Sequence, residues 1–169
     1  MRRSLDFTYN AAGVLAALFL VGTLVMVLVG ILGRLLDFHV PGTDAYAGYC
    51  MAGAGFLALA HTLKRGEHIR VTLIIEHLTG RSHRALTLWA LAAGAVLAAL
   101  FAYYSLRLAY QSYDFHDIST ANDATPLWIP QTTMAIGTVI LAIAMIDELV
   151  LEIARKRRPV VPTEALHNE

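Results

Sequence analysis

Apolar residues in this chain gather into four long runs, and polar residues fall mostly between them. The runs are Ala11–Leu32, Ala45–Leu63, Ala85–Leu106 and Ile129–Ile146. Crossing about 30 Å of hydrocarbon takes roughly 20 helical residues, and each run is of that order. At this segment length only a helix satisfies its own backbone hydrogen bonds inside lipid. The pattern therefore predicts an all-α integral membrane protein with four transmembrane helices.

The four runs define a single membrane domain, which we expect to cover residues 1–158. Residues 159–169 contain two prolines and end in polar residues, so we expect a flexible tail there. The first run is longer than the roughly 7–15 apolar residues of a cleaved signal peptide, and no small-x-small site follows it. We therefore expect the first run to be retained as a membrane span.

Residues 68–79, between the second and third runs, are too few and too polar to cross a membrane. On a helix their apolar side chains fall on one stripe, which is typical of a helix lying along a membrane surface. The alternation of Ile69, Val71 and Leu73 leaves a short strand open as the alternative. The residues expected to contact lipid on or beside this interfacial helix are Lys64, Arg65, Arg70, Val71, Ile74, Ile75 and Leu78.

Basic residues are distributed unevenly among the connections. Eleven of the thirteen Lys and Arg residues lie at positions 2–3, 64–84 or 155–158. The connections over residues 34–44 and 107–128 carry two basic residues against five Asp residues. Because short cytoplasmic connections accumulate Lys and Arg, this distribution predicts that both termini lie on the cytoplasmic side.

The composition and the motifs exclude several classes of protein. Charged residues make up 15% of the chain, against about 25% in soluble domains, which excludes a soluble domain. A formal net charge of zero gives no sign of a nucleic-acid partner. Metal-binding HExxH, a phosphate-binding glycine loop and a nucleophile elbow are all missing, and Cys50 is the only cysteine. We expect neither enzymatic activity nor a cofactor.

Two other functions depend on ionisable groups inside the runs. A haem held between helices needs two axial histidines at depth, but only His61 of the seven histidines lies within a run, near its end. An autonomous antiporter needs a carboxylate embedded in the membrane, and the centres of the runs have no ionisable residue. A stand-alone small transporter or channel, and a membrane anchor of a redox complex, are kept as the alternative functions.

Two stretches of the chain carry a family resemblance. The first runs from Phe56 to Val71 and contains Arg65-Gly66 followed by His68-Ile69-Arg70-Val71. The second is Pro126-Leu127-Trp128-Ile129-Pro130-Gln131, followed by Met134 and Gly137. Over roughly residues 10–150 the chain resembles the small membrane subunit, or Q component, of tripartite ATP-independent periplasmic transporters. It departs from the family's common Trp and Glu at the start of the second helix, where it has Thr43, Asp44 and Tyr46.

The resemblance implies a function and a set of partners. Such transporters couple sodium entry to organic-acid uptake across the bacterial inner membrane, and a periplasmic substrate-binding protein delivers the substrate. A large membrane subunit holds the substrate and sodium sites and moves as an elevator, while the small subunit braces it. We therefore expect this chain to be the accessory subunit, with the large subunit, the binding protein and membrane lipids as partners.

Within this function we expect the outer connections to face the binding protein; the alternative is that they are ordinary solvated loops. Small residues in the second and third runs also have two interpretations, which are close packing within the chain and docking onto the partner subunit. The residues expected to contact the binding protein are Arg34, Asp37, Asp44, Asp114, Asp117, Asp123 and Trp128.

Overall fold

The computed structural model describes residues 2–38, 40–65 and 81–154, and these residues form four α-helices with no sheet. The all-α class is confirmed, and each predicted run lies inside one helix. The interfacial helix predicted at 68–79 and the tail predicted at 159–169 lie outside the described residues. The helices are α1 (Arg2–Leu35), α2 (Thr43–Arg65), α4 (Arg81–Asp114) and α5 (Trp128–Ile153).

Three of the described helices are long and apolar enough to cross a membrane. The candidate spans are Leu5–Leu35, Ser82–Asp114 and Trp128–Ile153. Helix α2 is not among them, since it is rich in glycine and tyrosine and contains His61 near its end. Its role as a fourth span stays a prediction.

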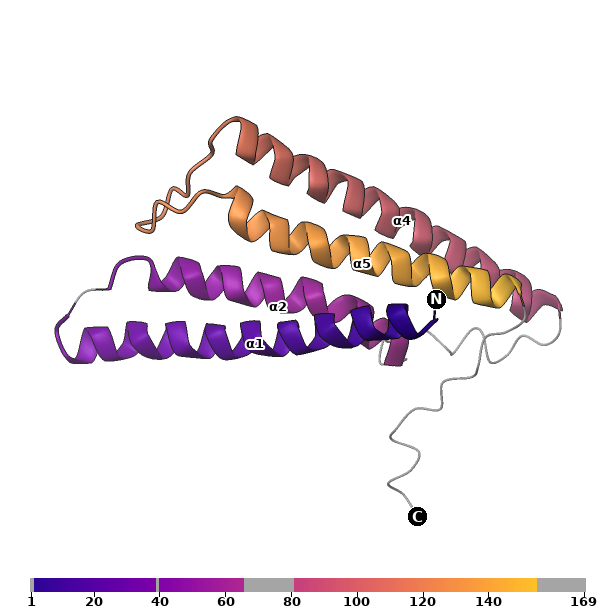
Figure 1. The fold of residues 1–169 in the computed structure, drawn as a ribbon, viewed down its shortest axis with the longest axis horizontal. Coiled ribbons are helices and arrows are strands. Elements are labelled where there is room, and N and C mark those ends of the chain that lie inside the picture. The colour runs from indigo at the N-terminus through magenta and orange to yellow at the C-terminus, as the bar shows by residue number, and fades with distance from the viewer. Residues whose placement is uncertain (1, 39, 66–80, 155–169) are drawn as a thin grey trace, which may run out of the picture.

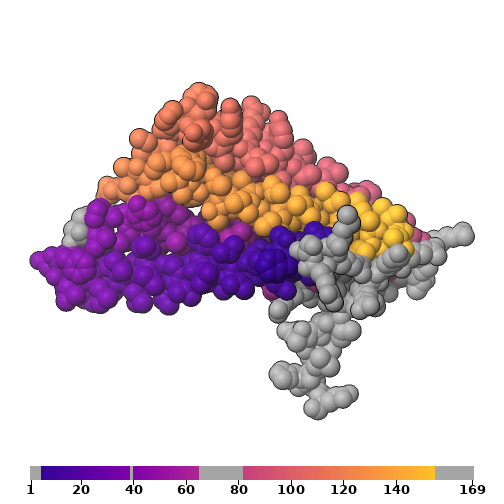
Figure 2. All heavy atoms as spheres, in the orientation of Figure 1, coloured from indigo at the N-terminus to yellow at the C-terminus, as the bar shows by residue number. Residues whose placement is uncertain are grey.

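The helices form two hairpins that lie side by side in one layer (Figure 1). Helix α1 packs along α2, α4 packs along α5, and the hairpins meet where α2 packs along α5. Helix α1 touches α5 only slightly, and the backbone of α4 approaches neither α1 nor α2. Helix α4 reaches α2 through a ring contact, in which Phe101 meets Phe56 edge-on with 5.8 Å between centroids. The order across the layer is therefore α1, α2, α5, α4, and Figure 2 shows α1 and α4 along its opposite edges.

The two ends of the layer are formed by different parts of the chain. One end, called the terminal end, holds the start of α1, the end of α2, the start of α4 and the end of α5 (Figure 1). The opposite end, called the loop end, holds the connection from α1 to α2 and the connection from α4 to α5. The described beginning and the described end of the chain thus lie at the same end of the layer.

Small residues make the contacts between helices, and large ones face outwards. Ten of the thirteen buried hydrophobic residues in the described part of the chain are alanines, whereas Leu18 of α1 is 61% exposed. This is the reverse of a soluble core, and it suits helices in lipid, where small residues permit close approach. The small residues of α2 fall into two groups, those packed against another helix and those facing open space. A Cβ added at Gly53 would meet Phe19 at 3.1 Å, whereas one added at Gly48 or Gly55 would meet nothing within 4 Å.

Two clusters of buried residues join the helices. Tyr9, Ala60, Leu63 and Ala144 bring together α1, α2 and α5 near the terminal end. A second cluster joins α4 to α5 through Ala98, Ala102 and Ala142.

Helices α2 and α5 also approach each other closely at Gly137. A Cβ placed on this glycine would lie 2.6 Å from the carbonyl carbon and oxygen of Phe56. The obstacle is backbone, which cannot rotate away as a flexible side chain can. Glycine at position 137 is therefore a requirement of the contact between the hairpins.

We predict that Gly137→Ala lowers the free energy of unfolding by about 1–3 kcal/mol, the usual cost of overpacking. Thermal or denaturant unfolding of the purified protein measures this change. The matched control is Gly55→Ala, which adds the same methyl group to a helix where it meets nothing within 4 Å. Equal stability of the two variants would contradict the close approach of α2 and α5.

Candidate functional site

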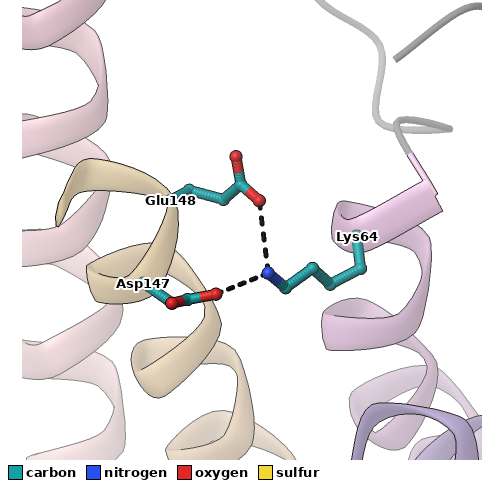
Figure 3. Close-up of polar contacts among 3 residues, drawn as sticks. All are labelled: Lys64, Asp147 and Glu148. Carbon is teal, nitrogen blue, oxygen red and sulfur yellow. Dashed lines mark hydrogen bonds and ion pairs between the residues drawn. The ribbon is translucent and has the colours of Figure 1, made fainter. Parts of the chain in front are cut away.

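Lys64 of α2 reaches across the terminal end of the layer to two carboxylates of α5 (Figure 3). Its ammonium donates to Asp147 Oδ2 at 2.5 Å and lies 3.5 Å from Glu148 Oε1. The three side chains are 21%, 21% and 13% exposed, respectively. Because they are partly withdrawn from water, their attraction is screened less than in an exposed pair, which contributes about 0–1 kcal/mol. These three residues are called the clamp.

Helix α1 joins the clamp through Tyr9. The Lys64 Nζ atom lies 5.3 Å from the centroid of the Tyr9 ring, within the range of a cation–π contact. His61 Nδ1 lies 3.2 Å from the backbone oxygen of Tyr9. Since a carbonyl oxygen only accepts hydrogen bonds, this ring nitrogen carries the proton. Three helices, α1, α2 and α5, therefore meet at one polar cluster at the terminal end.

At the loop end, the α4–α5 connection folds back onto the first turns of α2. The Tyr49 hydroxyl donates to Asp123 Oδ2 at 3.1 Å and lies 3.0 Å from Ser119 Oγ. The Ser119 hydroxyl itself donates to Asp123 Oδ1 at 2.7 Å. Tyr49, Ser119 and Asp123 are called the latch. Like the clamp, the latch ties one hairpin to the other.

The backbone of the α4–α5 connection is shaped to present Asp123 to α2. Ser119 N donates to the backbone oxygen of Thr125 at 2.9 Å, which closes a narrow turn, and Ala124 within this turn has φ of 47°. The turn lies against Gly42, whose φ is 80° and where a Cβ would come within 2.7 Å of Asp123 Cβ. Gly42 is therefore required both by its left-handed backbone and by the close approach of the turn.

The hydrogen bonds of the latch hold Asp123 in its charged form. The hydrogen bond from Ser119, helped by smaller ones from Thr125 and Tyr49, outweighs the effect of partial burial and lowers the pKa of Asp123 from 3.8 to about 2. A carboxyl whose pKa is lowered by folding stabilises the folded state above its unfolded pKa. The contribution of the latch is therefore complete above pH 3.8 and is lost as the pH falls towards about 2.

A hollow of about 570 Å³ opens beside the latch at the loop end. Its walls come from the last turns of α1, the α1–α2 connection, the first turn of α2 and residues 121–122 of the α4–α5 connection. Arg34, Asp37 and Asp44 line it. Arg34 and Asp44 form an ion pair of 3.4 Å with side chains 78% and 88% exposed. A pair this exposed is weak, so either group can exchange it for a contact with another molecule.

The other four residues predicted to face the binding protein also lie at the loop end, in unequal settings. Asp114 and Asp117 are exposed at the end of α4 and just beyond it. Asp123 is half-buried and belongs to the latch. Trp128 begins α5, and its ring meets Tyr113 edge-on with 5.7 Å between centroids. The structure thus separates two freely exposed carboxylates from one that has a structural partner.

Of the residues expected to contact lipid beside the interfacial helix, the structure describes the side chain of Lys64. Its ammonium faces Asp147 and Glu148 of α5. The remaining residues of this set lie outside the described side chains: Arg65, Arg70, Val71, Ile74, Ile75 and Leu78.

Sequence reasoning missed the partners within the clamp and the latch. The signal for the clamp was available, since Lys64 ends the second run where Asp147 and Glu148 end the fourth, on the same predicted side. No comparable signal marks the latch, because Tyr49 and Asp123 are 74 residues apart and meet through the fold of a loop.

These features describe a helical, multi-pass membrane protein whose charged groups lie at the two ends of its helices. Comparison with protein families assigns it more closely. The family model described as Tripartite ATP-independent periplasmic transporters, DctQ component, matches residues 23–155. The chain belongs to this family, as its sequence resemblance predicted. No curated protein and no solved structure matches the chain.

The matched residues cover the last part of α1, from residue 23 onwards, and all of the three other helices. They include every residue of the clamp, the latch and the walls of the hollow. The family is a component of transporters, not a family of enzymes, and its members work with the other components of those transporters.

We predict that Lys64→Ala and Asp147→Ala each lower the free energy of unfolding by about 1–3 kcal/mol, since the first leaves Asp147 without its partner and the second leaves Lys64 only its longer contact with Glu148. The double variant should lose less than the sum of the two, because the second substitution removes the charge that the first one leaves. Denaturant unfolding of the two single variants and the double variant measures this coupling.

The matched control for the clamp is the exposed pair of Arg34 and Asp44, which should couple by about 0–1 kcal/mol. Strict additivity at Lys64 and Asp147 would show that the clamp does not hold the hairpins together.

Proposed function

We propose that this chain is the accessory small permease subunit of a sodium-coupled, binding-protein-dependent secondary transporter for organic acids, and that it braces the large elevator-type membrane subunit. Family membership supports the partnership. The observation that carries the bracing role is that the two hairpins are tied at both ends of one layer, by the clamp and by the latch. A layer fixed at both ends resists splaying when a neighbouring subunit moves.

The middle of the layer supports a role without substrate binding. Helix α2 has no Asp, Glu, Lys or Arg between Asp44 and Lys64, and α4 has none between Arg84 and Arg107. Sodium and organic acids need charged or polar ligands at membrane depth. Their sites therefore belong to the large subunit on this proposal, which disfavours the stand-alone transporter kept as the alternative.

We place all four helices across the bacterial inner membrane as one domain, residues 1–158, with the terminal end in the cytoplasm and residues 159–169 as a tail. The unequal distribution of Lys and Arg supports this orientation, since Lys64 and Arg84 lie at the terminal end. The interfacial helix predicted at 68–79 connects α2 to α4, so it belongs at the same membrane surface.

The open face of α2 is the surface we assign to the large subunit. Gly48, Ala52 and Gly55 lie along it at helical spacing, and each is exposed. Lipid covers small residues poorly, whereas another helix packs closely against them. Helix α2 is also the described helix whose hydropathy is too low to count as a candidate span, which further favours protein over lipid as its neighbour.

We predict that Ala52→Phe abolishes co-purification of this chain with the large subunit and reduces organic-acid uptake to the level seen on deletion of the chain. A large ring on this face prevents a second helix from approaching. The measurement is affinity purification from membranes, followed by an uptake assay in cells.

The control for this experiment is Leu18→Phe on the exposed face of α1, which should leave both co-purification and uptake unchanged. Normal assembly of Ala52→Phe would remove α2 from the interface. Normal uptake after deletion of the whole chain, with the large subunit correctly inserted, would count against the accessory function itself.

The loop end is the surface we assign to the binding protein. Asp37, Asp114 and Asp117 are exposed there, and the hollow beside the latch is of a size that holds a few side chains. This acidic surface suits a basic patch on the incoming protein. Long-range attraction of this kind acts mainly on the rate of association.

We predict that the double reversal Asp114→Lys with Asp117→Lys raises the KM for uptake roughly 10-fold at low ionic strength, with Vmax unchanged, because association slows. Asp123 is left intact, since its reversal would break the latch. Uptake kinetics at two salt concentrations provide the measurement. The control reversal is Asp6→Lys, on an exposed residue at the terminal end. A KM that stays at the wild-type value would favour ordinary solvated loops.

A further inference from the structure

Helix α4 carries a continuous exposed stripe along the edge of the layer. Its members follow one another at spacings of seven, four, three, four and three residues, which places them on one side of a helix. Helix α4 packs on α5, and its ring contact with α2 is made by Phe101, which is not a member of the stripe, so this side is open. The stripe consists of Trp89, Val96, Leu100, Tyr103, Arg107 and Tyr110, all of them exposed.

The order of residues along the stripe matches the profile of a bilayer. Trp89 is 70% exposed towards the terminal end, and Tyr110 is 69% exposed towards the loop end. The 21 positions between them span about 31 Å of helix, against about 30 Å for the hydrocarbon core. Trp and Tyr favour the two membrane interfaces, and the aliphatic Val96 and Leu100 fall between them.

The stripe is poorly suited to a partner helix. Helices in membranes approach each other through small residues, whereas every member of this stripe has a large side chain. The exposed side chains of α1 between Val14 and Leu32 are aliphatic, and the exposed Arg34 at its end is paired with Asp44. No described side chain of α1 is an exposed Trp or Tyr, so the aromatic residues single out α4.

Arg107 is the charged member of the stripe. Tyr103 lies four residues before it and Tyr110 three residues after it, so all three side chains leave the same side of the helix. Arg107 is 18 residues from Trp89, or about 27 Å along the axis, which reaches the headgroup boundary. Within the described residues it forms no ion pair; Asp114, on the same side, is two helical turns away, about 10 Å.

An exposed guanidinium at this depth is suited to binding a phosphate. It presents paired donors that match the oxygens of a phosphate, and tyrosine hydroxyls on either side add further donors. We propose that the stripe is a lipid-facing edge of the assembled transporter and that Arg107, flanked by Tyr103 and Tyr110, binds the phosphate of a phospholipid in the leaflet at the loop end. The acyl chains then lie over Leu100 and Val96. This inference rests on the membrane placement of α4 proposed above.

Native mass spectrometry of the detergent-purified complex, supplied with phosphatidylglycerol or phosphatidylethanolamine, tests the phosphate site. We expect the Arg107→Ala complex to retain one phospholipid fewer than the wild type. The loss should be the same with either lipid, because the phosphate that Arg107 recognises is common to both. Arg34→Ala is the matched control, since Arg34 is also exposed at the loop end but lines the hollow beside Asp44 and is not flanked by the tyrosines of the stripe; its lipid count should equal that of the wild type. Equal counts for Arg107→Ala and the wild type would overturn the site.

A spin label tests the lipid-facing edge independently. The label is placed at Val96→Cys in a Cys50→Ala background, and the complex is reconstituted in phospholipid nanodiscs. High accessibility to oxygen is expected, because oxygen concentrates in hydrocarbon. A shielded label, or one that cross-links to the large subunit, would overturn the assignment of this edge. If the chain failed to co-purify with a large subunit, the proposed function would fail, and the lipid count on the chain alone would still decide the role of Arg107.

Discussion

The contact between α2 and α5 holds the layer together. Helix α1 touches α5 only slightly, and α4 reaches α2 through the ring contact of Phe101 with Phe56, so most of the contact between the described parts of the two hairpins lies between α2 and α5. In lipid no hydrophobic effect drives helices together, and association depends on close packing and polar ties. The seam uses both. Gly137 lets the backbones meet at Phe56 in the middle, and hydrogen-bonded groups join the hairpins at each end.

The positions of the polar ties follow from the cost of charge in a membrane. A charged side chain at the bilayer centre costs at least roughly 2.5–3.5 kcal/mol, so ionic contacts are tolerated where helices leave the hydrocarbon. Lys64 and Asp147 meet at the terminal end, and Asp123 meets Tyr49 at the loop end. The middle of the seam is left to van der Waals contact between small residues. The hairpins are thus fixed at two widely separated points, which opposes both splaying and sliding.

The helices could be predicted from the sequence because hydrophobic runs of this length have few other solutions. All four predicted runs lie inside helices, and the succession of the runs correctly groups the ends of the helices. The ends of the helices were harder to predict from the sequence. The fourth run was placed to Ile146, yet α5 continues through Asp147 and Glu148 to Ile153, because Lys64 of another helix compensates these carboxylates.

The partners within the site were harder to predict than the helices, since they depend on the order of helices across the layer. A sequence predicts that the loop-end residues lie at the same end of the helices, but not that α2 lies beside α5. The position of α2 beside α5 explains why Asp123 contacts Tyr49 while Asp114 and Asp117 stay exposed. Three aspartates that look equivalent in the sequence therefore have two different roles in the structure.

The surfaces of the layer also determine how a larger assembly can form around it. In the proposed assembly, the α4 edge faces lipid, as its aromatic residues and Arg107 indicate. The open face of α2 contacts the large subunit, as its small residues indicate. The hollow at the loop end is lined by Asp44 of the first turn of α2, so it lies at the end of the same helix that meets the large subunit. The latch closes one wall of the hollow through residues 121–122, so the contact that ties the hairpins together also shapes the surface offered to the binding protein.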